Sequence, residues 1–172
     1  SRRHQVVSGL DAPQLTESHG VITYNGKSYW VGEWVDGKNL SALANSGHSI
    51  NSNQVSALGA MLCKGLDNMS EENVVHGDLR PEMIHLTESG EIRIDGFGRH
   101  PSVASPPNGK SIRYRAPEGG ASISADVYSV GLCLAELLLG RKVSFESKEA
   151  AQYKNELRHF VRELSKHAPA SL

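Results

Sequence analysis

Residues 76–83 read HGDLRPEM. An apolar pair at 74–75 leads into this stretch. Two short runs, Met-Ile-His-Leu at 83–86 and Glu-Ile-Arg-Ile at 91–94, follow it with a Ser-Gly pair at 89–90 between them. A Ser-Gly turn between two short runs of this kind is typical of a β hairpin. We therefore expect a loop that leads directly into a small hairpin.

A second hairpin is expected nearer the N-terminus. β-rich runs at 21–24 and 28–35 flank Asn25-Gly26, a dipeptide that strongly favours the tight turn of a hairpin. Residues 36–39, which read Asp-Gly-Lys-Asn, are expected to close this unit as a turn.

Three segments show the period of about 3.6 residues that is typical of amphipathic helices. Ser52 or Asn53 is expected to cap the first helix. Its apolar face would consist of Val55, Leu58, Leu62, Leu66 and Met69. The second helix is expected over Asp126–Leu139, stopped by Gly140, and the third over residues 153–167. The predicted fold class is therefore α+β, with small β hairpins and a mostly helical body.

Length, charge and cysteine content exclude several classes of protein. A chain of 172 residues corresponds to about one domain, and a net charge of -1 argues against a protein that coats nucleic acid or an anionic membrane. No apolar run approaches the roughly 20 residues that cross a bilayer, and we expect no export leader. Cys63 and Cys133 both lie in apolar helical patterns, so we expect buried free thiols in a reducing compartment, the cytoplasm.

Five segments of the chain, taken together, form a recognisable order. They are Glu33–Gly37, His76–Met83, Ile94–Gly98, Tyr114–Glu118 and Asp126–Gly131. This order resembles that of eukaryotic-type protein kinases, in which the segments are the hinge, the catalytic loop, the metal-binding turn, the end of the activation segment and the core helix of the large lobe. The sequence is more similar to bacterial members of this family than to animal ones.

The resemblance covers about residues 20–166 and implies a protein-kinase-like α+β fold, with a mostly helical large lobe and an abbreviated small lobe of β structure. It implies that residues 1–36 are a remnant of the small lobe, with its last helix, strands and hinge. Residues 37–172 would be the large lobe without its final helices.

The resemblance also implies roles for individual residues. Asp78 matches the catalytic base, and Arg80 stands where a Lys usually approaches the transferred phosphate. Met83 and Gly96 stand where the family has its two metal ligands, an Asn and an Asp. Mg²⁺ requires hard oxygen ligands, which a thioether and a glycine do not supply, and Asp95 is expected to point elsewhere. We therefore expect no metal and no bound cofactor.

Further departures from the family pattern support the same expectation. Residues 1–20 contain no Lys, and no Gly-x-Gly-x-x-Gly occurs in the chain. His85 occupies the position that forms the floor under adenine, and Gly77 replaces an Arg that pairs with a phosphorylated activation loop. The positions that maintain the fold are retained, namely His76, Phe97, Gly98, Glu118 and Asp126. Of these, His76 is expected to be a core histidine. Glu118, whose usual Arg partner has no match in this chain, is expected either to pair with another residue or to lack the ion pair.

These residues predict a catalytically inactive kinase-like domain, a pseudokinase that is not an enzyme and serves as a scaffold or regulatory protein-binding module. Two alternatives stay open. One is an atypical active Ser/Thr kinase or small-molecule phosphotransferase that uses Asp78. The other is a nucleotide sensor that binds ATP without a metal.

Another protein is the expected partner, and neither nucleic acid nor insertion into a membrane is expected. Trp30 and Trp34 would lie on one face of a strand, in the core or at the lobe interface, unless a short small lobe leaves one of them exposed. A loop rich in Pro and Ser is expected over residues 99–112. The candidate partner surface combines the two tryptophans with residues in or beside this loop: Trp30, Trp34, Arg99, His100, Ser105 and Arg113.

Overall fold

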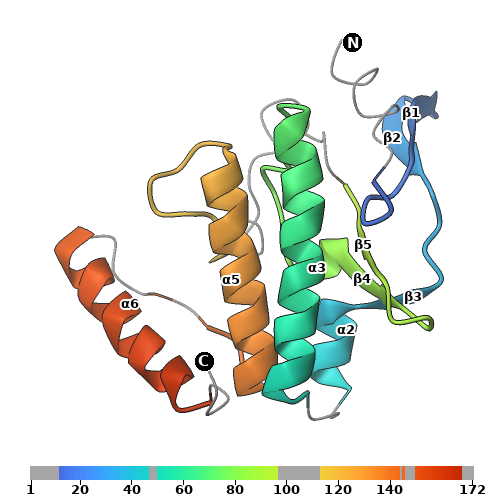
Figure 1. Cartoon of the computed structure of the whole chain (residues 1–172). Helices are drawn as coiled ribbons and strands as arrows, with labels where there is room; N and C mark the ends of the chain where they lie inside the picture. The colour runs from blue at the N-terminus through green and yellow to red at the C-terminus, as the bar shows by residue number, and fades with distance from the viewer. Residues whose placement is uncertain (1–11, 47–49, 97–112, 144, 146–149, 168–172) are drawn as a thin grey trace.

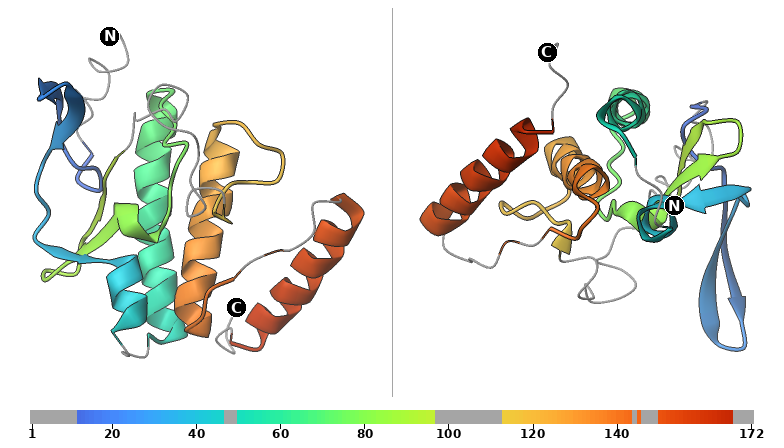
Figure 2. Two further views of the ribbon diagram at one scale, coloured as in Figure 1. Left: turned by 180° about the vertical axis from the view of Figure 1, so that it is seen from behind. Right: turned by 90° about the horizontal axis from the view of Figure 1, so that it is seen from below.

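The computed structural model describes residues 12–46, 50–96, 113–143, 145 and 150–167 (Figure 1). In chain order the elements are β1 (Ser18–Tyr24), β2 (Lys27–Gly32), β3 (Gly37–Asn39), α2 (Leu40–Asn45), α3 (Ser52–Glu71), the 3₁₀ helix η1 (Pro81–Met83), β4 (Ile84–Thr87), β5 (Ile92–Ile94), α5 (Ile123–Leu139) and α6 (Ala150–Ser165). The strands form two antiparallel sheets, β1-β2 and β3-β4-β5. Helices α3 and α5 pack side by side, with β5 against α3 and α6 against the far side of α5 (Figure 2). This arrangement confirms the predicted α+β class.

The first hairpin forms where the sequence predicts it, because its turn is encoded locally. Asn25 and Gly26 both have positive φ, 49° and 70°, as the two central residues of a type I′ turn require. Strand β2 ends at Gly32, so Trp34 does not share its strand with Trp30 as expected. Trp34 is 89% exposed and Trp30 is half-buried, which excludes Trp34 from the core.

The second sheet contains a strand that the sequence pattern did not predict. Residues 36–39 were expected to be a turn, but Gly37–Asn39 is the strand β3, paired with β4. The close pairing of β3 with β4 depends on the small size of Gly37. A methyl group on Gly37 would lie 2.5 Å from the carbonyl oxygen of Leu86, so glycine permits the close approach of these two strands.

We expect Gly37→Ala to lower the free energy of unfolding by about 1–3 kcal/mol, because the added methyl group collides with backbone atoms of β4. The matched control is Gly131→Ala at an exposed position of α5, where the added methyl group meets no atom within 4 Å. This control should raise the free energy of unfolding by about 0.5–1 kcal/mol, because alanine favours a helix interior over glycine. Urea unfolding measures both changes, and equal midpoints for Gly37→Ala and the unchanged chain would contradict the first expectation.

The helices match their predicted faces, although their first residues differ. Helix α3 is capped by Asn51, not by Ser52 or Asn53, and Asn51 and Gln54 form a reciprocal capping box. The five residues predicted for its apolar face are all buried. Helix α5 begins three residues before Asp126 and ends at Leu139, followed by the cap residue Gly140, whose φ is 63°.

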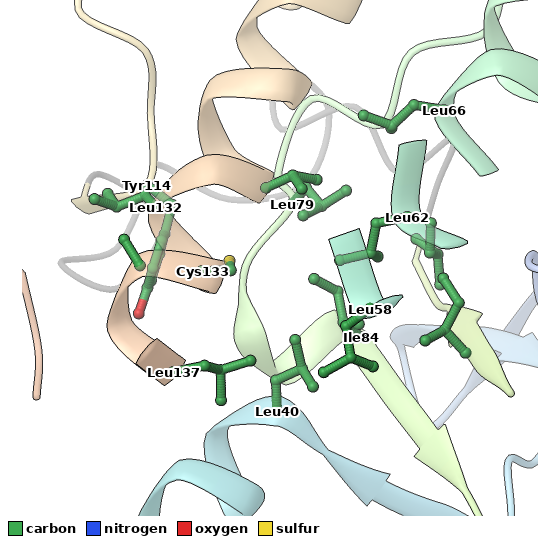
Figure 3. Close-up of a cluster of buried hydrophobic side chains, with 14 of the residues drawn as sticks. Leu40, Leu58, Leu62, Leu66, Leu79, Ile84, Tyr114, Leu132, Cys133 and Leu137 are labelled. Carbon is green, nitrogen blue, oxygen red and sulfur yellow. The ribbon is translucent and has the colours of Figure 1, made fainter. Parts of the chain in front are cut away.

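The core lies between α3, α5 and the second sheet (Figure 3). Leu58 and Leu62 of α3 gather in one cluster with Leu40 and Ile84. Helix α5 contributes Cys133 to the same cluster. Cys133 is buried as expected, but Cys63 is exposed. Position 63 follows Leu62 by one residue, which turns it by about 100° away from the apolar stripe. No helix in the described part of the chain is long and apolar enough to span a membrane.

Candidate functional site

The loop at residues 76–80 is held in place by one buried carboxylate. Asp126, in the first turn of α5, is 1% exposed. Its Oδ2 accepts a hydrogen bond from the backbone N–H of His76 at 2.7 Å, and its Oδ1 accepts one from the N–H of Gly77 at 2.9 Å. Gly77 has a φ of 76°, which favours glycine at this bend. The loop conformation therefore depends on a helix about 50 residues further along the chain.

His76 connects this loop to the residue that follows β5. Its ring is buried, its Nε2 lies 2.9 Å from the carbonyl oxygen of Asp95, and its Nδ1 accepts the N–H of Asp78 at 3.3 Å. Burial lowers the pKa of His76, although the carbonyl of Asp95 and nearby carboxylates act in the opposite direction. A neutral ring that donates from Nε2 satisfies both contacts. The residue is thus part of the core, as expected.

Asp78 lies on the same loop beside a cation. Arg80 Nη1 donates to Asp78 Oδ2 in a short ion pair, and it also lies 3.4 Å from the carbonyl oxygen of Asp78. The carboxylate of Glu82 is 3.7 Å from Arg80 Nε. All three side chains are partly exposed, so a carboxylate and a guanidinium are presented together at the surface of a loop that Asp126 holds in place.

Asp95 follows β5 directly, and its carbonyl oxygen contacts the buried ring of His76 at the start of this loop. Its N–H donates to the carbonyl oxygen of Met83 at 2.8 Å, and the hydroxyl of Thr16 lies 3.4 Å from its Oδ1. Burial lowers the pKa of His85 on β4, and the negative charge of Asp95 opposes that effect. The carboxylate of Asp95 is therefore close enough to influence both His76 and His85. Gly96, which follows it, is buried and has a φ of 83°.

The other predicted site residues are dispersed. Phe97, Gly98, Arg99, His100 and Ser105, like the predicted loop over residues 99–112, lie outside the described residues. Arg113 and Glu118 are both exposed, and within the described ranges Glu118 has no ion pair.

The candidate partner surface is not one patch among the described residues. The segment at 113–122 lies beside α5, whereas Trp30 belongs to the hairpin at the opposite side of α3 (Figure 1).

Sequence reasoning missed Tyr114, Ser129 and Glu136, which form a buried polar cluster around α5. A single acidic residue in the apolar run from Leu132 to Leu139 was the available signal, because a charge at a buried position is rarely tolerated without partners. Among the described residues, no group of three or more His, Cys, Asp or Glu side chains could hold a metal ion.

Comparisons with known proteins point to one family. The chain matches the family model described as protein kinase domain over residues 2–170. It is 24% identical to the probable serine/threonine-protein kinase mkcF of Dictyostelium discoideum, over 84% of this chain and 22% of that protein. It is 24% identical to the serine/threonine-protein kinase PrkC of Bacillus subtilis, over 87% of this chain and 24% of that protein. It is 30% identical to the MAP kinase kinase MKK1/SSP32 of Saccharomyces cerevisiae, over 87% of this chain and 32% of that protein.

These matches confirm the resemblance and correct one expectation. The chain was expected not to be an enzyme, and this is wrong, because the family is catalytic and the relatives are named as kinases. The prediction of an inactive domain depended in part on a missing phosphate loop and a missing Lys. The chain spans less than a third of the length of these relatives, so the lack of those elements in it carries no conclusion about the whole protein.

Proposed function

Because the chain belongs to the protein kinase family, we propose that it is part of an atypical kinase that transfers the γ-phosphoryl group of ATP to a serine or threonine hydroxyl. One observation carries the proposal: Asp78 and Arg80 are presented together on a loop that the buried Asp126 fixes. The names of the relatives support serine and threonine as acceptors.

In this mechanism Asp78 takes the proton of the acceptor hydroxyl. The hydroxyl oxygen then forms a bond to the γ-phosphorus while the bond from that phosphorus to the bridging oxygen breaks, so that ADP leaves. Arg80 keeps a permanent positive charge beside the base, and its planar group carries five donors that suit phosphate oxygens. In the ion pair with Asp78 the donor is Nη1 of Arg80. The other nitrogen atoms of the guanidinium lie in the same plane.

The donor set of this loop fits a magnesium–nucleotide complex in part. Met83 supplies only a thioether, but Asp95 places a carboxylate beside the loop that carries Asp78. Mg²⁺ is commonly held by one or two carboxylates together with the phosphates of its substrate. We assign Asp95 to this role and leave Asp78 as the base. A bound metal ion would neutralise charge on the transferred phosphate.

Asp95→Asn tests this assignment. With labelled ATP, Mg²⁺ and a peptide that contains Ser and Thr, the purified protein should transfer phosphate, and Asp95→Asn should lower kcat at least about 10²-fold, because metal stabilisation of the transition state contributes several kcal/mol. The Mg²⁺ concentration for half-maximal rate should also rise. Asp67→Asn on the exposed face of α3 is the matched control and should leave both values unchanged.

Two outcomes would contradict the proposal. The first is the absence of transfer by the unchanged protein at any Mg²⁺ or Mn²⁺ concentration. The second is an Asp95→Asn protein whose rate and Mg²⁺ dependence equal those of Asp67→Asn, which would remove Asp95 from the metal site.

The acceptor in this proposal is another protein, and the compartment is the cytoplasm. Cys63 and Cys133 are free thiols, which supports a reducing environment. The exposed residues Trp34 and Arg113 are candidates for contacts with the acceptor or with a further protein.

A further inference from the structure

Helix α6 is joined to the rest of the chain by a polar contact near each of its ends. Near the first end, the hydroxyl groups of Tyr153 and of Tyr128 in α5 lie 2.6 Å apart and share a hydrogen bond. Near the other end, both carboxylate oxygens of Glu163 accept from Nη2 of Arg141, each at 2.9 Å. The ion pair at Glu163 is exposed to solvent, whereas the tyrosine hydroxyls are partly buried. The hydrogen bond between the tyrosines is therefore the better protected of the two contacts.

Aromatic rings add an apolar contact beside the tyrosine pair. The ring of Phe145 meets the rings of Tyr153 and Phe160 edge to face, with centroid distances of 5.1 Å and 5.5 Å. Aromatic pairs favour this arrangement, in which the positive edge of one ring faces the negative face of the other. Leu157, one turn after Tyr153, is half-buried and packs against the core. Side chains along one face of α6 therefore hold it to α5 and to the chain that follows α5.

This face buries much less apolar surface than the helices of the core do. Six of the 20 residues of α3 and nine of the 17 residues of α5 are buried, but only Phe160 is buried among the described side chains of α6. Helix α6 lies on the outer side of α5, away from α3 (Figure 2). Elements with few buried apolar contacts open at a lower free energy than the core to which they are attached.

The tyrosine pair does not titrate near neutral pH. Burial raises the pKa of Tyr128, and the hydrogen bond to Tyr153 and the negative charge of Glu118 act in the same direction. Burial also raises the pKa of Tyr153, as do the charges of Glu118 and Glu156, although the hydrogen bond with Tyr128 opposes them. Both hydroxyl groups therefore keep their protons, and the hydrogen bond is lost only when the two helices separate.

We infer that α6 opens from α5 as one unit while α3, α5 and the second sheet stay folded, and that the Tyr128–Tyr153 hydrogen bond sets how often it opens. In the closed form α6 partly covers Tyr128. In the open form the ring and hydroxyl of Tyr128 face solvent. The chain thus has a second conformation, in which α5 presents an aromatic side chain, and this conformation does not depend on phosphate transfer.

Native-state hydrogen exchange of the full chain, without nucleotide, tests the inference. The amides of residues 154–165 should share one opening, with protection at least about 10-fold below that of the slowest amides of α3. Ile92→Val shortens a buried side chain of β5, which stays folded in both forms. It should therefore speed exchange of the slowest amides of α3 about 2- to 10-fold, because it weakens the core, and leave residues 154–165 unchanged.

Tyr153→Phe removes one hydroxyl and keeps the ring. It should speed exchange of residues 154–165 together by about 2- to 10-fold, the effect of one hydrogen bond. The slowest amides of α3 should speed by the same factor, because the closed form from which the whole chain unfolds has lost that bond. Tyr128→Phe removes the same bond from α5, and the double variant should be no worse than the worse single variant. Tyr24→Phe, at a tyrosine that is 65% exposed, is the matched control and should leave exchange unchanged.

Three results would overturn the inference. If Ile92→Val speeds residues 154–165 as much as α3, α6 is released only when the whole chain unfolds. If Tyr153→Phe and Tyr128→Phe exchange like Tyr24→Phe, the hydrogen bond does not set the opening. If Tyr153→Phe speeds only the amides within one turn of residue 153, the helix frays and does not open as a unit. All three results stand whether or not the protein transfers phosphate, so they are independent of the proposed function.

Discussion

Asp78→Asn is expected to lower the rate of phosphate transfer about 10²- to 10⁴-fold, the contribution that a general base makes to a reaction of this kind. Asparagine has nearly the same shape as aspartate, and its carbonyl oxygen can still accept from Arg80, but its amide cannot take the proton of the acceptor. The loss should fall on kcat, with the KM for ATP changed little. The measurement is the initial rate of transfer from labelled ATP to a Ser/Thr peptide at saturating concentrations.

Two controls keep this result specific. Glu91→Gln removes a carboxylate from the exposed turn between β4 and β5 and should leave the rate unchanged. The thermal midpoint of Asp78→Asn should lie close to that of the unchanged chain, because a partly exposed ion pair contributes at most about 1 kcal/mol to stability. A folded Asp78→Asn protein with full activity would show that another group accepts the proton.

Elements whose signals are local could be predicted from the sequence. The turn at Asn25-Gly26 and the buried stripe of α3 depend only on residues near each other in the chain. Strand β3 and the six-residue helix α2 could not be predicted in this way. β3 exists because it pairs with β4, nearly 50 residues later, and α2 is too short to show a helical period.

The site was predicted in outline but not in its details. The order of motifs identified the loop with Asp78 and the retained Asp126, because each motif occupies a fixed place in the family. The surroundings of Asp95 were not predicted, because its side-chain oxygen Oδ1 lies 3.4 Å from the hydroxyl of Thr16, a residue 79 positions earlier in the chain. The expectation that the chain is not an enzyme was wrong because it relied on residues that are missing from this chain, which spans less than a third of the length of its relatives named as kinases.

Asp126→Ala is expected to lower the free energy of unfolding by about 3–6 kcal/mol. The substitution removes a buried carboxylate that accepts two backbone hydrogen bonds, and bonds to a charged group contribute about 1.5–3 kcal/mol each. The amides of His76 and Gly77 would then be left without their acceptor, next to the buried ring of His76. Since a domain of this size is stabilised by about 5–15 kcal/mol in total, the variant should be partly unfolded at 37 °C.

Asp126→Asn separates the hydrogen bonds from the volume of the side chain. Its carbonyl oxygen can accept from one of the two amides, but its NH₂ group faces the other N–H, so about half of the loss should remain. Urea unfolding with Asp67→Ala on exposed α3 as the reference gives both values. Equal midpoints for Asp126→Ala and Asp67→Ala would contradict the role of α5 as the support of the loop. Because that same helix also holds Tyr114, loss of Asp126 should speed hydrogen exchange at residues 76–80 before it affects residues 114–122.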